Sequence, residues 1–140
     1  MSDKYEIEAT DYGMRLAFKG FASPEEIAEL NRQMERTIVG LPDGFGVIVD
    51  MRENRAFPHE VAELMKKQID MCKERGMGRG AIVLQSAIMT LQARRITSEA
   101  GISPQVRFLD ASADPKWEQT ALEWISQGVE PPARVMGGEG

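Results

Sequence analysis

Hydrophobic and polar residues alternate in two short segments near the start of the chain, 4–10 and 14–18. In the first, apolar residues occupy positions 5, 7 and 9 and glutamates lie between them. A period of two predicts strands that each bury one face. The intervening Asp11-Tyr12-Gly13 is a turn signal. We therefore expect the chain to begin with an antiparallel hairpin.

Three later segments are continuous apolar runs without alternation: Phe45 to Asp50, Ala81 to Leu84 and Val106 to Leu109. Short, β-branched runs of this kind are typical of strands that are buried on both faces. Glycines or prolines lie just before each run. We expect three such strands, with the first of them in the middle of the sheet.

Four segments repeat their apolar residues at helical spacing. The first begins at Ser23-Pro24-Glu25-Glu26, which has the pattern of a capping box, and ends near Gly40. The second begins at Pro58 and ends near Gly76. The third spans about 86–100, and the fourth follows Asp114-Pro115 and ends by Gly128. We expect two sets of side chains to face the sheet: Ile88, Leu91 and Ile96 on the third helix, and Trp117 and Trp124 on the fourth.

The predicted order is ββαβαβαβα, an α/β fold with a mixed five-stranded sheet, an N-terminal β-hairpin and four helices. Alternating strands and helices favour parallel, right-handed crossovers. Residues 1–128 account for all of these elements, so we predict a single domain. Residues 129–140 are rich in proline and glycine and predict a flexible C-terminal tail.

Composition narrows the classes of function. The net charge of −5 argues against nucleic acid as the main partner. The single cysteine excludes an intrachain disulfide and fits a reducing, cytoplasmic setting. No apolar run approaches the roughly 18 residues of a membrane helix, so we expect no stable membrane insertion. One histidine and one cysteine cannot form a usual zinc site, and no cofactor motif is present.

The order of elements, the two-strand start and the strand end VIVDMR (47–52) together resemble the STAS family. This family is typified by the sporulation anti-sigma factor antagonist and includes its SpoIIAA-like relatives. The resemblance covers about residues 4–127. It implies a SpoIIAA/STAS-like fold and a non-enzymatic regulatory or ligand-sensing role of the kind used in bacterial signalling.

The chain departs from this family at the usual phosphoacceptor. Phosphoregulated members carry Ser or Thr where the helix after that strand begins. The corresponding segment here is RAFPHE (55–60), and no hydroxyl residue lies between Asp50 and Lys67. The departure argues against a kinase-controlled switch. It leaves the SpoIIAA-like branch, which is also similar to the sheet-and-helix lobe of lipid-carrying CRAL-TRIO domains.

Five residues at predicted strand ends are candidates for binding a ligand or partner: Asp50, Arg52, Arg55, Gln85 and Ser86. Ligands of strand–helix folds bind at the carboxyl ends of strands. Arginines suit phosphate or carboxylate by their fork geometry, and backbone N–H groups at a helix start can hold an anion. For each residue a structural role is the alternative: Asp50 as a loop brace, the arginines in surface ion pairs, Ser86 as a helix cap.

Other residues have simpler expected roles. We expect His59 at the surface or as a helix cap, and Cys72 in the core. Arg94 and Arg95 predict a basic face on the third helix, either solvated or in contact with a partner.

Three functions remain open. The first is a regulatory or interaction domain that binds a protein partner or small ligand through its strand-end loops, with a homo-oligomer left open. The second is a carrier of an apolar ligand such as a lipid, which needs a cavity. The third is a small enzyme, although no catalytic motif is present.

Overall fold

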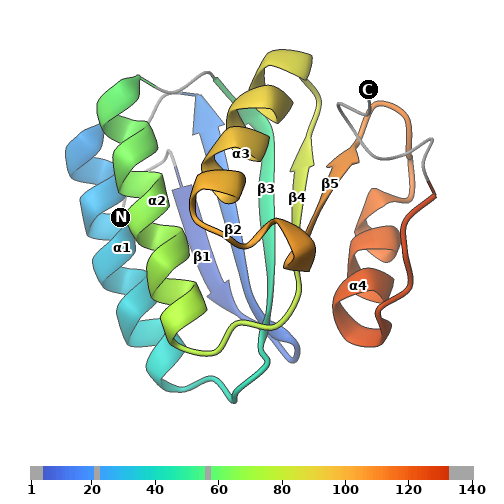
Figure 1. The fold of residues 1–140 in the computed structure, drawn as a ribbon, viewed down its shortest axis with the longest axis horizontal. Coiled ribbons are helices and arrows are strands. Elements are labelled where there is room, and N and C mark those ends of the chain that lie inside the picture. The colour runs from blue at the N-terminus through green and yellow to red at the C-terminus, as the bar shows by residue number, and fades with distance from the viewer. Residues whose placement is uncertain (1–4, 21–22, 56–57, 133–140) are drawn as a thin grey trace.

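The computed structural model describes residues 5–20, 23–55 and 58–132, and its centre is a five-stranded sheet (Figure 1). The spatial order of the strands is their order in the chain. β1 pairs antiparallel with β2, and every other pair is parallel. β3 therefore lies in the middle, as predicted. The strands are β1 (Tyr5–Ala9), β2 (Gly13–Gly20), β3 (Gly46–Asn54), β4 (Gly80–Leu84) and β5 (Val106–Asp110).

Helices cover the two faces of the sheet unequally (Figure 1). α1 (Pro24–Val39), α2 (His59–Glu74) and α3 (Ala87–Glu99) connect the parallel strands and lie on one face. A short 3-10 helix, η1 (Ser103–Gln105), precedes β5, and α4 (Trp117–Gln127) packs on the other face. Crossovers of the same hand place their helices on the same side of a sheet. The predicted ββαβαβαβα architecture is confirmed.

Local sequence signals explain the helix boundaries. The hydroxyl of Ser23 accepts a hydrogen bond from the backbone N–H of Glu26 at 3.1 Å. The Glu26 carboxylate accepts one from the backbone N–H of Ser23 at 2.8 Å, which completes the capping box. Gly128, in a left-handed conformation with φ of 70°, ends α4.

The core has two parts, one on each face of the sheet. The larger part lies under α1, α2 and α3 and includes Leu16, Leu30 and Phe108. The smaller part lies under α4, where Trp124 and Ile125 pack on Ile48, Ala81, Val83 and Leu109. The Trp124 indole donates a hydrogen bond to the carbonyl oxygen of Gly80 at 3.0 Å. Trp117 packs against the same cluster but is only partly buried.

The predicted inward face of α3 is wrong for two of its three residues. Ile96 is buried, but Ile88 is 66% exposed and Leu91 64% exposed. The helix faces the sheet with a second stripe, in which Met89, Ala93 and Ile96 recur at spacings of four and three. Because both stripes contain apolar residues, periodicity alone could not choose between them.

The start of the predicted tail is placed against the domain. Glu130 accepts hydrogen bonds from Arg107 at 2.9 and 2.7 Å, and Pro131 is buried. The rest of the predicted flexible tail, residues 133–140, lies outside the described residues.

Candidate functional site

The carboxyl ends of the parallel strands lie at the same end of the sheet, which we call the strand-end edge. β3 ends there at Asn54, β4 at Leu84 and β5 at Asp110. β2 ends there as well, at Gly20, so four connections leave from this edge, and the last of them leads into the first turn of α4. Asp114 holds that turn, since its carboxylate accepts hydrogen bonds from the backbone N–H of Lys116 and the hydroxyl of Thr120. Residues of β2, β3, α3 and α4 are thereby brought together.

Asp50 and Arg52 form a bidentate ion pair at this edge. Nε and Nη2 of Arg52 donate to the two carboxylate oxygens of Asp50 at 2.9 and 2.8 Å. The backbone N–H of Arg52 donates to the same carboxylate at 3.1 Å. Asp50 is 8% exposed, so the pair is partly removed from water. This two-pronged geometry is the strongest form of a carboxylate–guanidinium contact.

The surroundings of Asp50 favour its charged form. Burial raises the pKa of its carboxyl, but the hydrogen bonds from Arg52 and the charges of Arg52 and Arg15 outweigh burial. The net result is a pKa below the ordinary value for aspartate. The hydrogen bond to Asp50 in turn raises the pKa of Arg52. Both partners therefore remain ionised at neutral pH.

Three further residues complete what we call the Asp50 cluster: Arg15 on β2, and Trp117 and Glu118 on α4. Arg15 donates to Glu118 at 2.6 Å and lies 3.7 Å from the Asp50 carboxylate. The guanidinium carbons of Arg52 and Arg15 lie 4.5 and 5.7 Å from the centre of the Trp117 ring. The two positive charges face two carboxylates, so the cluster is balanced. Chemically it braces β2, β3 and α4 and presents a partly exposed, cation-flanked indole.

The other predicted site residues lie beside this cluster. The Gln85 amide donates to the backbone carbonyl of Arg52 at 3.4 Å, which ties the start of α3 to the end of β3. The Ser86 hydroxyl accepts from the backbone N–H of Met89 at 3.3 Å and so caps α3. The backbone N–H of Arg55 donates to the Gly20 carbonyl, which places Arg55 where β2 and β3 end.

Directly after Ser86, the outer face of α3 carries the exposed apolar pair Ile88 and Leu91. Arg95 is exposed on the same face, seven residues after Ile88. Two large apolar side chains are therefore exposed close to Ser86, which follows the carboxyl end of β4. We call Ile88, Leu91 and Arg95 the α3 face.

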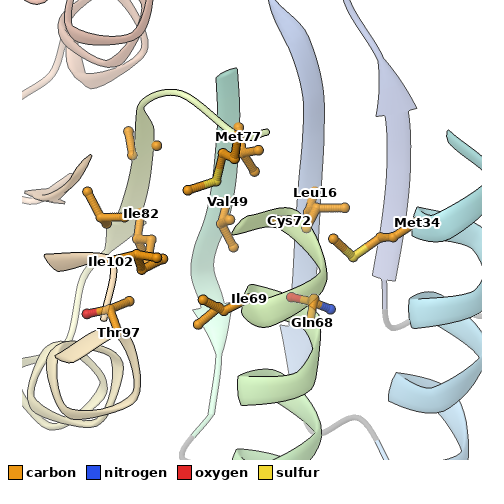
Figure 2. A pocket seen from close by; sticks show the side chains of 14 residues that line it. Leu16, Met34, Val49, Gln68, Ile69, Cys72, Met77, Ile82, Thr97 and Ile102 are labelled. Carbon is orange, nitrogen blue, oxygen red and sulfur yellow. The ribbon is translucent and has the colours of Figure 1, made fainter. Parts of the chain in front are cut away.

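A second feature lies on the face of the sheet that α1, α2 and α3 cover, where an apolar cleft runs between α2 and α3. Val49 and Ile82 pair in register on the central strands, yet both are only partly buried. Two cavities of about 50 Å³ each open here. Figure 2 shows the first, with Val49 and Ile82 on strands and Ile69 on α2 among its lining side chains. Five residues line both cavities: Val49, Gln68, Ile69, Ile82 and Thr97.

Two further residues considered in the sequence are His59 and Cys72. His59 is exposed at the first residue of α2. Cys72 is buried, as predicted, and burial raises the pKa of its thiol to about 12, which favours the protonated thiol at neutral pH. Within residues 5–20, 23–55 and 58–132, no three His, Cys, Asp or Glu residues group as metal ligands would. No helix in this described part is long and apolar enough to cross a membrane.

Sequence reasoning found Asp50 and Arg52 but missed Arg15, Trp117 and Glu118 as their neighbours. The signal for Arg15 was its place on the outward face of the second strand. The signal for the other two was the turn at Asp114-Pro115, which starts α4 at the strand-end edge. Neither signal shows which residues meet, because contact across the sheet depends on register.

Comparison with known proteins supplies a match at the level of fold. No protein-family model matches the chain, and no curated protein matches it. Among solved structures, it is similar to an uncharacterised DUF3478-family protein from Shewanella loihica PV-4, described as having a SpoIIAA-like fold. The TM-score is 0.60 at 19% sequence identity, over 89% of this chain and 98% of that one. The chain therefore has a SpoIIAA-like fold, in agreement with the resemblance seen in its sequence.

Proposed function

We propose that this chain is a non-enzymatic interaction domain that binds a protein partner at the strand-end edge. The α3 face supplies the apolar anchors, and Gln85 and Ser86 lie at the start of the same helix. The observation that carries the proposal is the exposure of Ile88 and Leu91 on a helix that has a complete inward face without them. Burying such side chains against a partner stabilises a complex by about 1.5–3 kcal/mol each.

The Asp50 cluster supports this role in an indirect way. Its carboxylate is already engaged by Arg52, which suits a brace better than a general base. Gln85 connects this brace to the start of α3. The α3 face is therefore presented on a rigid support, which lowers the entropy lost on binding. Arg95 adds a positive charge, so the expected partner surface is apolar with a carboxylate beside it.

Capture from native lysate tests the proposal. The double variant Ile88→Ser/Leu91→Ser should bind the captured partner at least about tenfold more weakly than the parent chain, because both anchors are lost. The partner is identified by mass spectrometry, and its dissociation constant is then measured by calorimetry with purified proteins.

Val39→Ser is the matched control for this experiment. Val39 is 71% exposed and ends α1, just before the loop that leads to the amino end of β3. The Val39→Ser variant should bind the captured partner with the same affinity as the parent chain. Equal capture by the parent chain and the double variant would remove the α3 face from the proposal.

A second candidate function is the binding of an apolar ligand in the cleft between α2 and α3. The observation in its favour is the partial exposure of Val49 and Ile82 in the middle of the sheet. Each cavity is about a third of the roughly 150 Å³ that accommodates benzene in an apolar core. Since the two cavities share walls, the ligand that fits best is one unbranched alkyl chain.

Decanoic acid is a suitable probe for this cleft. In methyl NMR spectra, titration should shift the signals of Val49, Ile69 and Ile82, while the signal of Ile88 on the outer face of α3 stays in place. The chemical-shift changes at Val49, Ile69 and Ile82 should saturate as the concentration of decanoic acid rises. Shifts that are strongest at Ile88 and Leu91 would instead indicate non-specific adsorption to exposed apolar residues, and would reject the cleft as the site.

A further inference from the structure

The apolar cleft between α2 and α3 contains a buried amide, that of Gln68. This residue of α2 lines both cavities of the cleft, yet it is only 4% exposed. None of the described residues that line either cavity is charged. Thr97, the other polar residue that lines both, donates its hydroxyl proton to the backbone carbonyl of Arg94 at 3.1 Å. In folded proteins the polar atoms of a buried amide normally have hydrogen-bond partners.

A short chain of hydrogen bonds fixes the orientation of the Gln68 amide. Nδ2 of Asn31 on α1 donates to the backbone carbonyl of Leu64 at 3.3 Å, which turns Oδ1 of Asn31 toward Gln68. Nε2 of Gln68 donates to that oxygen at 3.0 Å. Rotating the Gln68 amide by half a turn would bring two oxygens together, and rotating both amides would bring the Asn31 oxygen against the Leu64 carbonyl. The nitrogen of Gln68 therefore faces α1.

The amide oxygen of Gln68 faces the cleft instead. Figure 2 shows this oxygen on the side of Ile69 and the nitrogen on the side of Met34, which belongs to α1. Within the described part of the chain, no residue donates a hydrogen bond to Oε1 of Gln68. A buried acceptor without a donor is unfavourable. A ligand that brings a donor to this oxygen therefore gains affinity over one that does not.

We propose that the cleft binds an aliphatic alcohol, whose hydroxyl donates to Oε1 of Gln68 and whose alkyl chain occupies the apolar cavities. The uncharged lining disfavours a buried carboxylate or ammonium group. Decanoic acid can place its alkyl chain here only with its carboxylate in water. The inference rests on the second candidate function, the binding of an apolar ligand in this cleft, and it adds the polar group that such a ligand carries.

Two isomers of the same formula test this inference: 1-hexanol, which carries a hydrogen-bond donor, and 1-methoxypentane, which carries none. Their dissociation constants are measured by methyl NMR titration, read at Val49, Ile69 and Ile82. 1-Hexanol should bind about 3- to 10-fold more tightly, which is the net effect of one hydrogen bond. A cleft without a usable acceptor would not prefer the alcohol, because the ether loses less hydration on leaving water.

The possible failures are distinguishable. Binding of the ether as tightly as the alcohol, or more tightly, would overturn the inference and leave the cleft as a plain apolar site. If neither compound gave saturable shifts at the three residues, both the inference and the second candidate function would be rejected.

Two glutamines provide a matched pair of variants. Gln68→Met removes the acceptor but keeps the length of the side chain, so the advantage of 1-hexanol should disappear while 1-methoxypentane still binds. Gln119 is exposed on α4, on the other face of the sheet, and Gln119→Met should leave the ratio of the two affinities unchanged. An advantage of 1-hexanol that survived in Gln68→Met would rule out Oε1 as the acceptor. Should Gln68→Met fail to fold, the comparison of the two isomers on the parent chain still decides.

Discussion

Replacement of Trp124 by alanine is expected to lower the free energy of unfolding by about 3–5 kcal/mol. Trp124 is 6% exposed and packs on Ile48, Ala81, Val83 and Leu109. Its indole N–H also satisfies the carbonyl oxygen of Gly80, which the substitution would leave buried without that donor. Urea denaturation followed by circular dichroism measures the change.

The same helix contains the control for this prediction. Leu122 is 36% exposed, so Leu122→Ala should lower the free energy of unfolding by only about 1 kcal/mol, well below the loss expected for Trp124→Ala. Trp124→Phe keeps most of the packing but removes the hydrogen-bond donor, and should fall between the two. If Trp124→Ala cost no more than Leu122→Ala, α4 would be peripheral to the fold, and Trp124 would become a candidate partner contact.

The second large effect is expected at Gly13, where β2 begins. Gly13 has φ of 150°, and an added Cβ would overlap the backbone carbonyl oxygen of Gly46 on β3. Because the obstacle is backbone and both strands are paired here, neither side can yield without breaking the ladder. Gly13→Ala should cost more than about 3 kcal/mol, which combines backbone strain with a steric clash.

Thermal and urea denaturation of Gly13→Ala can be compared with those of Gly40→Ala. Gly40 has φ of −89°, and an added Cβ would come no closer than 3.8 Å to other atoms. Its replacement should be neutral or slightly stabilising, since alanine restricts the unfolded chain. Similar stabilities for the two variants would show that the close approach of β2 and β3 is not required.

The sequence was sufficient to predict the architecture because its signals agree with each other. The Ser23 capping box, the alternation in the first two strands and the three continuous apolar runs each define an element independently. The order of these elements then leaves few topologies, because parallel crossovers have a preferred hand. The central position of β3 followed from its two buried faces.

The candidate site was less predictable because its geometry depends on contacts between distant elements. The pair Asp50 and Arg52 lies within one strand and could be identified, whereas Arg15 and Glu118 are separated by 103 residues. On α3, the stripe of Met89, Ala93 and Ile96 was as compatible with burial as the stripe of Ile88 and Leu91. The cleft depends on the spacing of α2 and α3 over the sheet, which side-chain volumes determine and periodicity does not.

The unequal covering of the sheet has a consequence for biosynthesis. α1, α2 and α3 alternate with the strands along the chain, but the face of Ile48, Ala81, Val83 and Leu109 depends on α4, which follows all five strands. A nascent chain emerges from the ribosome in sequence order. Until residues 117–127 have emerged, the growing domain carries an uncovered apolar strip. We therefore expect truncation before α4 to leave this strip exposed and to favour aggregation of the newly made protein.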